Sequence, residues 1–342
     1  MKKILISDPT LRDGNHAVAH QLSMEQIAVY AEAANAAGVP IVEVGHGNGL
    51  GASSLQVGES RETDFDMLET AKRYLTKSKL GIHVIPGFAT INKHLEPAVE
   101  LGVDVFRVAS HCTEADITQR HIGYVREKGR EAYGVLMMSH MASADLLVEE
   151  AQKMEQYGAE GIIIMDSAGA YLPSDVETKI TALVNNLKVP VGFHAHNNLG
   201  LAIANSIVAI TSGAKIIDGT ARGFGAGAGN AQLEVLVAVL DKLGYETGID
   251  LYKILDASDI AEAKVMNVVP IITSQSIVSG LAGVFSGFAK HVQRISKEYN
   301  VDQRDVYFEL GRRNAVGGQE DLIIEVVLAL VNKKSSNESN SN

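Results

Sequence analysis

Short runs of apolar, mostly β-branched residues alternate with longer segments of helical periodicity along roughly the first 240 residues. Eight of the apolar runs have the length of a buried strand, namely residues 4–7, 41–44, 80–85, 105–108, 132–138, 161–165, 189–193 and 215–218. A segment with helical spacing of its apolar positions follows each run, for example residues 23–37, 64–75, 143–157 and 198–211. This alternation is typical of a parallel α/β fold.

Eight strand–helix units in this length match the roughly 250 residues of a (β/α)8 barrel, so we expect a TIM barrel. Ser23 and Ser143 stand where helix N-caps are expected, and Gly38 and Gly158 stand just past two predicted helix ends. A doubly wound open sheet is the alternative fold. That fold often carries a glycine-rich turn after its first strand, whereas residues 8–16 are charged here.

The pattern changes after about Tyr245, where the alternation of strands and helices ends. Residues 265–292 are apolar and rich in small side chains, and two further helical segments follow them. Because the eight strands are already assigned, we expect the barrel to span residues 1–262. Residues 263–333 are expected to form an appended helical domain or an oligomer interface. The tail, residues 334–342, consists mostly of Ser and Asn and is expected to be disordered.

Charge and composition exclude several classes of function. The formal net charge is -11 and no basic stripe is present, so nucleic-acid binding is not expected. The first apolar run ends at Asp8, which predicts a strand and no export signal. No apolar stretch approaches the roughly 20 residues of a membrane helix. The single cysteine, Cys112, cannot form an intramolecular disulfide and fits a cytoplasmic location.

Ionisable and polar side chains gather directly at the ends of several predicted strands. They are Asp8, Arg12, Asp13 and His16 for the first strand, Glu43 and His46 for the second, Asp166 and Ser167 for the sixth, and His194 and His196 for the seventh. Because the active site of a TIM barrel lies at the C-terminal ends of its strands, we expect these residues to share one site.

His194 and His196 are spaced so that both imidazoles point to the same side of a strand end. Two imidazoles and one carboxylate leave room for water or substrate and suit a divalent ion such as Mn²⁺. A lone histidine at a strand end is more often a buried polar residue, but His-x-His together with Arg12-Asp13 favours a metal site. The lysines near the strands stand at their entering ends, so a Schiff-base aldolase is not expected.

Other polar positions have simpler interpretations. Glu43 either orients a ligand histidine or pairs with an arginine. The glycine-rich segment 219–229 lacks the Lys-Ser/Thr pair of a P-loop, which predicts a tight turn that lets loops cross. His83, His111 and His140 are interpreted mostly as packing or loop residues.

These motifs resemble those of a known group of enzymes. The segments Asp8-Pro-Thr-Leu-Arg-Asp-Gly14 and His194-Ala-His196-Asn resemble the superfamily of metal-dependent carbon–carbon lyases and synthases. That superfamily includes hydroxymethylglutaryl-CoA lyase, isopropylmalate synthase and the carboxyltransferase domains of biotin enzymes. The closer resemblance, over nearly the whole chain except the tail, is to the 4-hydroxy-2-oxovalerate aldolase family. It rests on residues 11–17, 20–21, 44–50, 166–169, 225–230, 309–313 and 317–321.

The resemblance implies a role for each candidate residue. The implied ligands of Mn²⁺, or of Mg²⁺ or Co²⁺ in its place, are Asp13, His194 and His196. Arg12 would hold the substrate and stabilise an enolate, His16 would be the catalytic base, and Ser167 would contact the substrate carboxylate. The implied substrate contacts are Arg12, Asp13, Ser167, His194 and Phe285.

Two positions depart from the family pattern. Phe285 stands where the family usually has a tyrosine, and a phenylalanine cannot donate a hydrogen bond to the substrate. Around the third strand, the segment His83-Val-Ile85 is more polar than the leucine-rich aldehyde pocket of the family. Both differences concern the choice of aldehyde and the stereochemistry, and they leave the metal ligands unchanged.

The implied activity is cleavage of 4-hydroxy-2-oxopentanoate to pyruvate and acetaldehyde, in the meta-cleavage catabolism of aromatic compounds. The C-terminal portion resembles the domain through which this family meets an acylating acetaldehyde dehydrogenase, so a hetero-oligomer or a homodimer is expected. One alternative is another carbon–carbon lyase or acyl-CoA-dependent synthase of the superfamily, which acts on a different 2-oxo acid. The other is a non-catalytic binding subunit, against which the complete set of ionisable residues argues.

Overall fold

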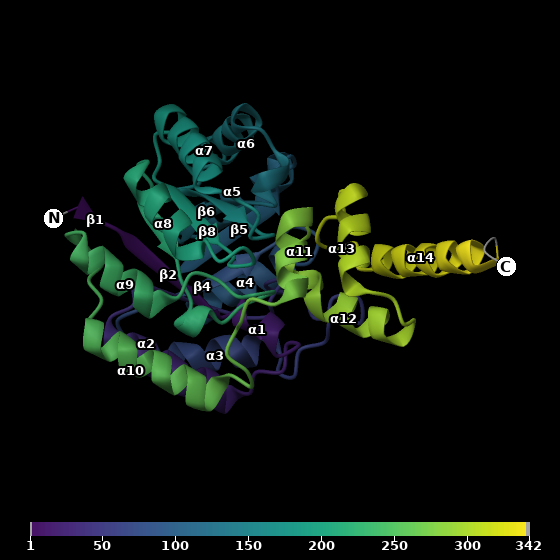
Figure 1. The fold of residues 1–342 in the computed structure, drawn as a ribbon. Helices are drawn as coiled ribbons and strands as arrows, with labels where there is room; N and C mark the ends of the chain where they lie inside the picture. The colour runs from purple at the N-terminus through teal and green to yellow at the C-terminus, as the bar shows by residue number, and fades with distance from the viewer. Residues whose placement is uncertain (1, 340–342) are drawn as a thin grey trace.

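Eight parallel strands close into a barrel in the computed structural model, which describes residues 2–339 (Figure 1). Each strand pairs with the next along the chain, and the last pairs with the first. The strands are β2 (Leu5–Leu11), β3 (Ile41–Val44), β4 (Lys79–Val84), β5 (Val105–His111), β6 (Glu131–Met137), β7 (Ile162–Asp166), β8 (Val191–Ala195) and β9 (Ile216–Asp218). The predicted TIM barrel is therefore confirmed, and the open sheet is excluded.

Helices that follow the strands cover the outside of the barrel (Figure 1). They are α2 (Met24–Ala37), α3 (Asp64–Tyr74), α4 (Glu96–Leu101), α5 (Gln119–Glu127), α6 (Ala144–Gln156), α7 (Pro173–Asn186), α8 (Ala202–Thr211), α9 (Leu233–Lys242) and α10 (Leu251–Ile260). Shorter segments are α1 (Gly14–Ala17), η1 (Ile91–Leu95), η2 (Ala115–Thr118), η3 (Ser139–Met141), η4 (Ala221–Gly223) and η5 (Ala261–Val265).

The ends of these helices follow the capping chemistry expected from the sequence. Ser23 and Gln26 form a capping box at the start of α2. Gly38 takes the left-handed conformation at the end of the same helix, with φ of 79°. The Ser143 hydroxyl accepts a hydrogen bond from the Leu146 amide at the start of α6. Local sequence therefore fixes where these helices begin and end.

The first barrel strand is longer than predicted. The charge of Asp8 suggested that the strand ends at residue 7, but β2 continues to Leu11 with a register shift against β3. The Asp8 side chain reaches α2, where its Oδ2 accepts a hydrogen bond from the Tyr30 hydroxyl at 2.6 Å. A partner on the covering helix thus lets a carboxylate stand within the strand. In addition, β1 (Lys2–Lys3) and β10 (Tyr245–Glu246) form a separate two-stranded parallel sheet that was not predicted.

The inward-facing side chains of the barrel form two layers of opposite character. An apolar cluster near the entering ends of the strands includes Ile41, Val105, Tyr133, Ile163 and Ile216. Alternate residues of a strand face the same side, so the next inward positions on β3, β5 and β9 belong to Glu43, Arg107 and Asp218. All three are buried. An apolar floor therefore carries a charged layer beneath the mouth of the barrel.

A second group of helices follows the barrel and packs beside its mouth (Figure 1). They are α11 (Ser274–Ala282), η6 (Ser286–Phe288), α12 (Ala289–Glu298), α13 (Gln303–Arg312) and α14 (Asp321–Ser339). They enclose a core of their own, which includes Phe288, Val292, Val306, Leu310 and Val327. The Ser286 amide donates to the Ser167 carbonyl oxygen at 2.9 Å, and Gln56 Nε2 donates to the Gly318 carbonyl oxygen at 2.7 Å. These bonds join the helical unit to loops of the barrel.

The ends of the helical unit can be compared with the expected boundaries. The expected boundary between residues 262 and 263 falls within η5. Helix α14 runs to Ser339, so residues 334–339 are helical although their composition led us to expect disorder. An existing helix extends at one hydrogen bond per added residue, which favours continuation from an apolar segment. Residues 340–342 lie outside the described part of the chain. Within residues 2–339, no helix has both the length and the apolarity needed to cross a membrane.

Candidate active site

Asp13, His194 and His196 converge at the mouth of the barrel. Asp13 follows β2, His194 lies in β8, and His196 directly follows that strand. One ligand-type atom from each residue lies within 4.8 Å of the other two, and His196 Nε2 is 3.6 Å from Asp13 Oδ2. All three side chains are buried. The structure thus brings together the three residues that the sequence indicates as metal ligands.

Both imidazoles are held through Nδ1, which leaves each Nε2 available. His194 Nδ1 lies 2.8 Å from Asp218 Oδ2, and His196 Nδ1 lies 3.0 Å from the Asp166 carbonyl oxygen. The two Nε2 atoms are buried without a hydrogen-bond partner among the described residues. Metal-ligating histidines usually have their second nitrogen held by a carboxylate or a carbonyl in this way. The donor set therefore fits a divalent metal ion.

Asp13 is surrounded by hydrogen-bond donors. Arg12 Nη1 donates to Oδ1 at 2.7 Å, and Asn230 Nδ2 and the Ala226 amide donate to Oδ2 at 2.7 and 3.2 Å. Burial acts to raise the pKa of Asp13, but Arg12 and the nearby imidazoles hold it well below its usual range. A Cβ atom at Gly225 would lie 2.5 Å from Asp13 Oδ2, so the glycine-rich turn lets this loop cross the site as predicted.

Arg12 is fixed between Asp13 and a second carboxylate. Its Nη2 lies 3.3 Å from Glu43 Oε1, and its Nη1 donates to the Gly47 carbonyl oxygen at 3.3 Å. Glu43 is buried and also faces Arg107, so it pairs with arginines and does not contact a ligand histidine. The Arg12 side chain is only 4% exposed. Its guanidinium is therefore held in place beside the ligand cluster.

His16 lies in α1 at the edge of a group of three imidazoles. Its ring meets His20 edge to face with centroids 5.0 Å apart, and His20 stacks on His46 at 3.6 Å. Burial lowers the pKa of His16 to about 3, so the imidazole is neutral near pH 7 and one of its ring nitrogens is unprotonated. His20 reaches its place from a backbone with φ of 63°, a left-handed conformation that a non-glycine residue rarely adopts.

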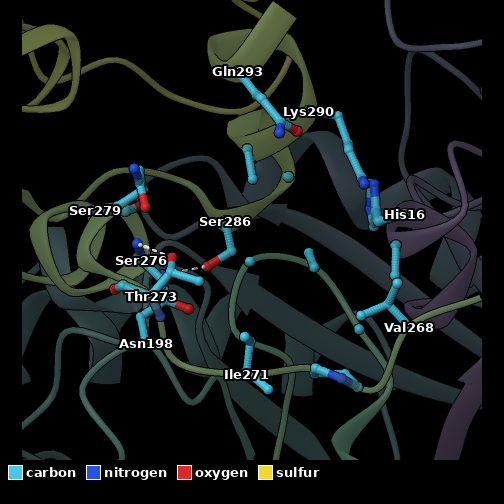
Figure 2. A pocket seen from close by; sticks show the side chains of 18 of the residues that line it. His16, Asn198, Val268, Ile271, Thr273, Ser276, Ser279, Ser286, Lys290 and Gln293 are labelled. Carbon is cyan, nitrogen blue, oxygen red and sulfur yellow. Dashed lines mark hydrogen bonds between the residues drawn. The ribbon is translucent and has the colours of Figure 1, made fainter. Parts of the chain in front are cut away.

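A cavity of about 430 Å³ opens beside His16, between the barrel mouth and the C-terminal helices (Figure 2). Its walls on the helical side include Ser276, Ser286, Lys290 and Gln293. Asn198 Nδ2 from the barrel donates to Ser286 Oγ at 3.2 Å across the junction, as the dashed line in Figure 2 marks. A cavity of this size suits a small organic substrate.

Ser167 and Phe285 lie on opposite sides of this junction. Ser167 follows β7, and its hydroxyl accepts a hydrogen bond from the Met138 amide at 3.0 Å. Phe285 precedes η6, and its ring stands edge-on to His16 with centroids 6.4 Å apart. The C-terminal helical unit therefore supplies a side chain next to the imidazole that could act as a base.

Several residues of the predicted strand-end group have structural roles. Asp166 accepts hydrogen bonds from the Ala170 and Tyr171 amides at 2.9 and 3.1 Å and closes the turn after β7. His140 contacts the Gly283 carbonyl oxygen at 2.9 Å, and His111 contacts the Thr113 hydroxyl, so neither belongs to the ligand cluster. The lysines expected at the entering ends do stand there, namely Lys3, Lys79, Lys188 and Lys215.

Sequence reasoning missed three buried residues around the site, Asp218, Arg107 and Asn230. Asp218 and Arg107 stand two residues beyond the apolar Ile216 and Val105 on the same strands, so the period-two pattern would have placed them inside. Asn230 ends the segment 225–230 that contributes to the family resemblance, but no role was predicted for it. His83 is 2% exposed inside the barrel, which agrees with its interpretation as a packing residue, and its Nδ1 has no partner among the described residues.

Comparison with protein families and solved structures agrees with this fold. The family model described as HMGL-like matches residues 3–261, and the one described as DmpG-like communication domain matches residues 270–332. The carboxyl transferase domain of Rhizobium etli pyruvate carboxylase, with pyruvate and biocytin, matches with a TM-score of 0.82 at 17% identity, over 97% of this chain and 61% of that chain. Such low identity shows the fold alone. Fold and site together define the class as the HMGL-like lyases and aldolases.

Relatives of high identity narrow the class. The chain is 65% identical over 335 residues to the 4-hydroxy-2-oxovalerate aldolase of Pectobacterium atrosepticum, which covers 98% of both chains. It is 66% identical over 324 residues to that of Spirochaeta aurantia, which covers 95% of both. The chain belongs to the 4-hydroxy-2-oxovalerate aldolase family and is a lyase. These matches over nearly the whole of both chains disfavour the alternative of another lyase or an acyl-CoA-dependent synthase of the superfamily.

Proposed function

We propose that this chain cleaves 4-hydroxy-2-oxopentanoate into pyruvate and acetaldehyde. One observation carries the proposal: the ligand cluster of Asp13, His194 and His196 lies beside Arg12 and His16, in a chain 65% identical to a named aldolase. The cavity next to His16 offers room for a small 2-oxo acid.

The residues of the chain account for the movement of protons and charge. Burial lowers the pKa of His16 to about 3, so one ring nitrogen carries no proton near pH 7. We assign the proton of the C4 hydroxyl to this nitrogen. The C3–C4 bond then breaks, its electron pair stays with C3 as the pyruvate enolate, and the C4 fragment leaves as acetaldehyde. Protonation of C3 completes pyruvate.

Charge stabilisation falls to Arg12 and to a metal ion. Asp13 and Glu43 hold the Arg12 guanidinium beside the ligand cluster, where it would face the developing enolate oxygen. We propose Mn²⁺ as the ion, with Mg²⁺ or Co²⁺ able to replace it, since these ions accept mixed oxygen and imidazole ligands. Asp13, His194 and His196 would hold the ion, which would act as a Lewis acid toward the 2-oxo acid. Ser167 would contact the substrate carboxylate.

We also propose a division of labour along the chain. Residues 1–262 would carry the chemistry, and residues 263–333 would contact an acylating acetaldehyde dehydrogenase. The match to a communication domain and the exposed apolar side chains of Ile324 and Leu328 support this second role. A partner that consumes acetaldehyde would remove a reactive product. The assembly would be a hetero-oligomer or a homodimer, and the lone buried thiol of Cys112 fits the cytoplasm.

The first experiment is to measure pyruvate release from racemic 4-hydroxy-2-oxopentanoate by metal-stripped protein, with and without added Mn²⁺. Release that depends on the metal is the expected result. Release without metal would contradict the assigned role of the ligand cluster. Metal binding without release would turn the proposal toward a different 2-oxo acid or an acyl-CoA substrate.

A further inference from the structure

Arg107 is an arginine buried in the middle of the barrel. It lies on β5 with a side chain that is only 1% exposed. Burying a guanidinium is costly unless carboxylates neutralise it and satisfy its donors. The groups that contact the Arg107 guanidinium therefore indicate its role.

Two carboxylates and a hydroxyl surround the guanidinium. Arg107 Nη2 donates to Asp218 Oδ2 at 2.6 Å, whereas Nη1 donates to Ser7 Oγ at 3.2 Å and faces Glu43 Oε1 at 3.4 Å. Burial acts to lower the pKa of Arg107, but Asp218 and Glu43 outweigh it and raise the pKa above its usual range. The same guanidinium keeps the pKa of Asp218 low against the opposing effect of burial.

Each of the two carboxylates also holds a residue of the candidate active site. Asp218 Oδ2 contacts His194 Nδ1 at 2.8 Å, and Glu43 Oε1 contacts Arg12 Nη2 at 3.3 Å. The contacts thus run without a break from His194 through Asp218, Arg107 and Glu43 to Arg12. They link the metal-ligand side of the mouth to its substrate side.

We infer that Arg107 is the positioning residue that sets His194 and Arg12 relative to each other. Its planar fork contacts both carboxylates at once, which the single ammonium of a lysine cannot reproduce in the same geometry. This inference rests on the metal and substrate roles proposed above. It adds that the distance between His194 and Arg12 is set by a residue deeper in the barrel, which contacts neither of them directly.

The test compares Arg107→Lys and Arg107→Gln with the unmodified full-length protein. Mn²⁺ affinity is measured by electron paramagnetic resonance titration of metal-stripped protein, and thermal unfolding is recorded in parallel. Both variants are expected to bind Mn²⁺ about 10-fold more weakly, the lower end of the effect of losing a partner of a metal-bound histidine, because Asp218 loses the guanidinium that orients it. Arg107→Lys keeps the buried positive charge, so it decides the question if Arg107→Gln does not fold.

A second readout tests the substrate side of the same contacts. At saturating Mn²⁺, oxalate is used as a planar stand-in for the pyruvate enolate, and its inhibition constant is measured for each variant. Arg107→Lys is expected to weaken oxalate binding as well, because Glu43 no longer fixes Arg12 in one orientation. A loss of Mn²⁺ affinity with unchanged oxalate binding would overturn the claim that one residue sets both halves.

The matched control is Ile163→Ala, which opens a cavity in the apolar floor of the same barrel and removes no charge. It should lower the unfolding temperature and leave Mn²⁺ and oxalate binding unchanged. If Arg107→Lys behaves like this control, Arg107 only stabilises the fold and the inference is wrong. Failure of the proposed function is distinguishable, because the unmodified protein would then fail to bind Mn²⁺, or would bind it without releasing pyruvate.

Discussion

The two histidines of the candidate metal site are held at Nδ1 by different kinds of acceptor. Asp218 offers His194 a carboxylate, whereas His196 has the Asp166 carbonyl oxygen. A carboxylate partner raises the basicity of the imidazole more than a carbonyl does, which makes His194 the stronger donor toward a metal. Burial lowers the pKa of His196 to about 4, so this imidazole is neutral and able to bind a metal ion near pH 7.

Replacing His194 therefore tests the ligand assignment directly. In His194→Ala we expect Mn²⁺ affinity to fall by about 100-fold or more and pyruvate release to stop, since one of three protein ligands is lost. Metal content after gel filtration is the measurement. His111→Ala, which removes an imidazole outside the cluster, is the control and should retain the metal. Normal Mn²⁺ affinity in His194→Ala would rule out the assignment.

Phe285 offers a test of how the aldehyde end of the substrate is recognised. Its ring lies next to His16, and it lacks the hydroxyl that a tyrosine would present there. We expect Phe285→Tyr to sharpen discrimination between the two 4-hydroxy enantiomers by about 10-fold, the value of one good hydrogen bond. The fraction of racemic substrate consumed at completion reports this change. Phe285→Leu is the control, and equal behaviour of both variants would mean that the position does not touch the reacting carbon.

At the scale of elements, helix caps and the alternation of inward and outward residues in strands depend on residues close together in the sequence. Both could therefore be predicted. Strand segments, the caps Ser23 and Ser143, and the inward pair His194 and His196 follow from spacing along the chain alone. The end of β2 could not be predicted in this way. It depends on Tyr30 of the covering helix α2, whose hydroxyl donates a hydrogen bond to the Asp8 carboxylate. This bond allows Asp8 to lie within the strand, although a buried carboxylate without a partner would end it.

The charged layer shows a second limit of sequence reasoning. Spacing can place Arg107 and Asp218 inside the barrel, but it does not say which inward residue meets which. Those contacts depend on the shear of the closed barrel, which brings β5 opposite β9 across the interior. The ligand cluster was predictable because its residues carry distinctive chemistry, whereas the residues that support it do not.

A single cap gives a prediction at this scale. The Ser143 hydroxyl satisfies the Leu146 amide at the start of α6, so Ser143→Ala should lower the free energy of unfolding by about 1 kcal/mol. Chemical denaturation at constant metal content is the measurement. Ser174→Ala, an exposed serine in the first turn of α7, is the control and should change stability by less than about 0.5 kcal/mol. Equal losses in both would contradict the capping role.

At the scale of the whole molecule, buried histidines make stability depend on pH. Burial lowers the pKa of His16 to about 3, of His20 to about 2 and of His46 to about 4, from an unfolded value of 6.5. Below pH 6.5 these histidines are protonated in the unfolded chain but stay neutral in the folded chain. The free energy of unfolding therefore decreases as the pH falls. Burial raises the pKa of Asp8 and Asp166 to about 6, which opposes this loss only in part.

We therefore expect the unfolding temperature of the metal-free protein to decrease steadily from pH 7 to pH 5. Each buried histidine contributes at most about 1.4 kcal/mol per pH unit. The variant His20→Phe keeps a ring stacked on His46 and removes one ionisable group, so its unfolding temperature should depend less steeply on pH. Calorimetry across the pH series measures both. An identical slope in the two proteins would show that His20 titrates normally in the folded state.

The projecting helix α14 provides a prediction about assembly (Figure 1). Ile324 and Leu328 stand four residues apart on one face and are 45% and 42% exposed. We expect substitution of both residues by Asp to weaken association with an acylating acetaldehyde dehydrogenase by about 10-fold or more. The rate of retro-aldol cleavage should change by less than about twofold, because both residues lie far from the candidate active site. Light scattering of the mixed proteins is the measurement. Tyr252→Asp on α10 is the control, and unchanged association in the double variant would place the contact elsewhere.

The charged layer inside the barrel also has a consequence for how the chain folds. Arg107 on β5 needs Glu43 on β3 and Asp218 on β9, and these residues are far apart in sequence. An incompletely closed barrel that lacks β9 would leave Arg107 with Glu43 as its only carboxylate, which it shares with Arg12. A barrel that lacks β3 would leave Arg107 with Asp218 alone and Arg12 with Asp13 alone. Partly assembled states are therefore penalised by unpaired buried charge. We therefore expect the barrel to form in one cooperative step. Its last strand, β9, would favour closure because it brings the Asp218 carboxylate to Arg107.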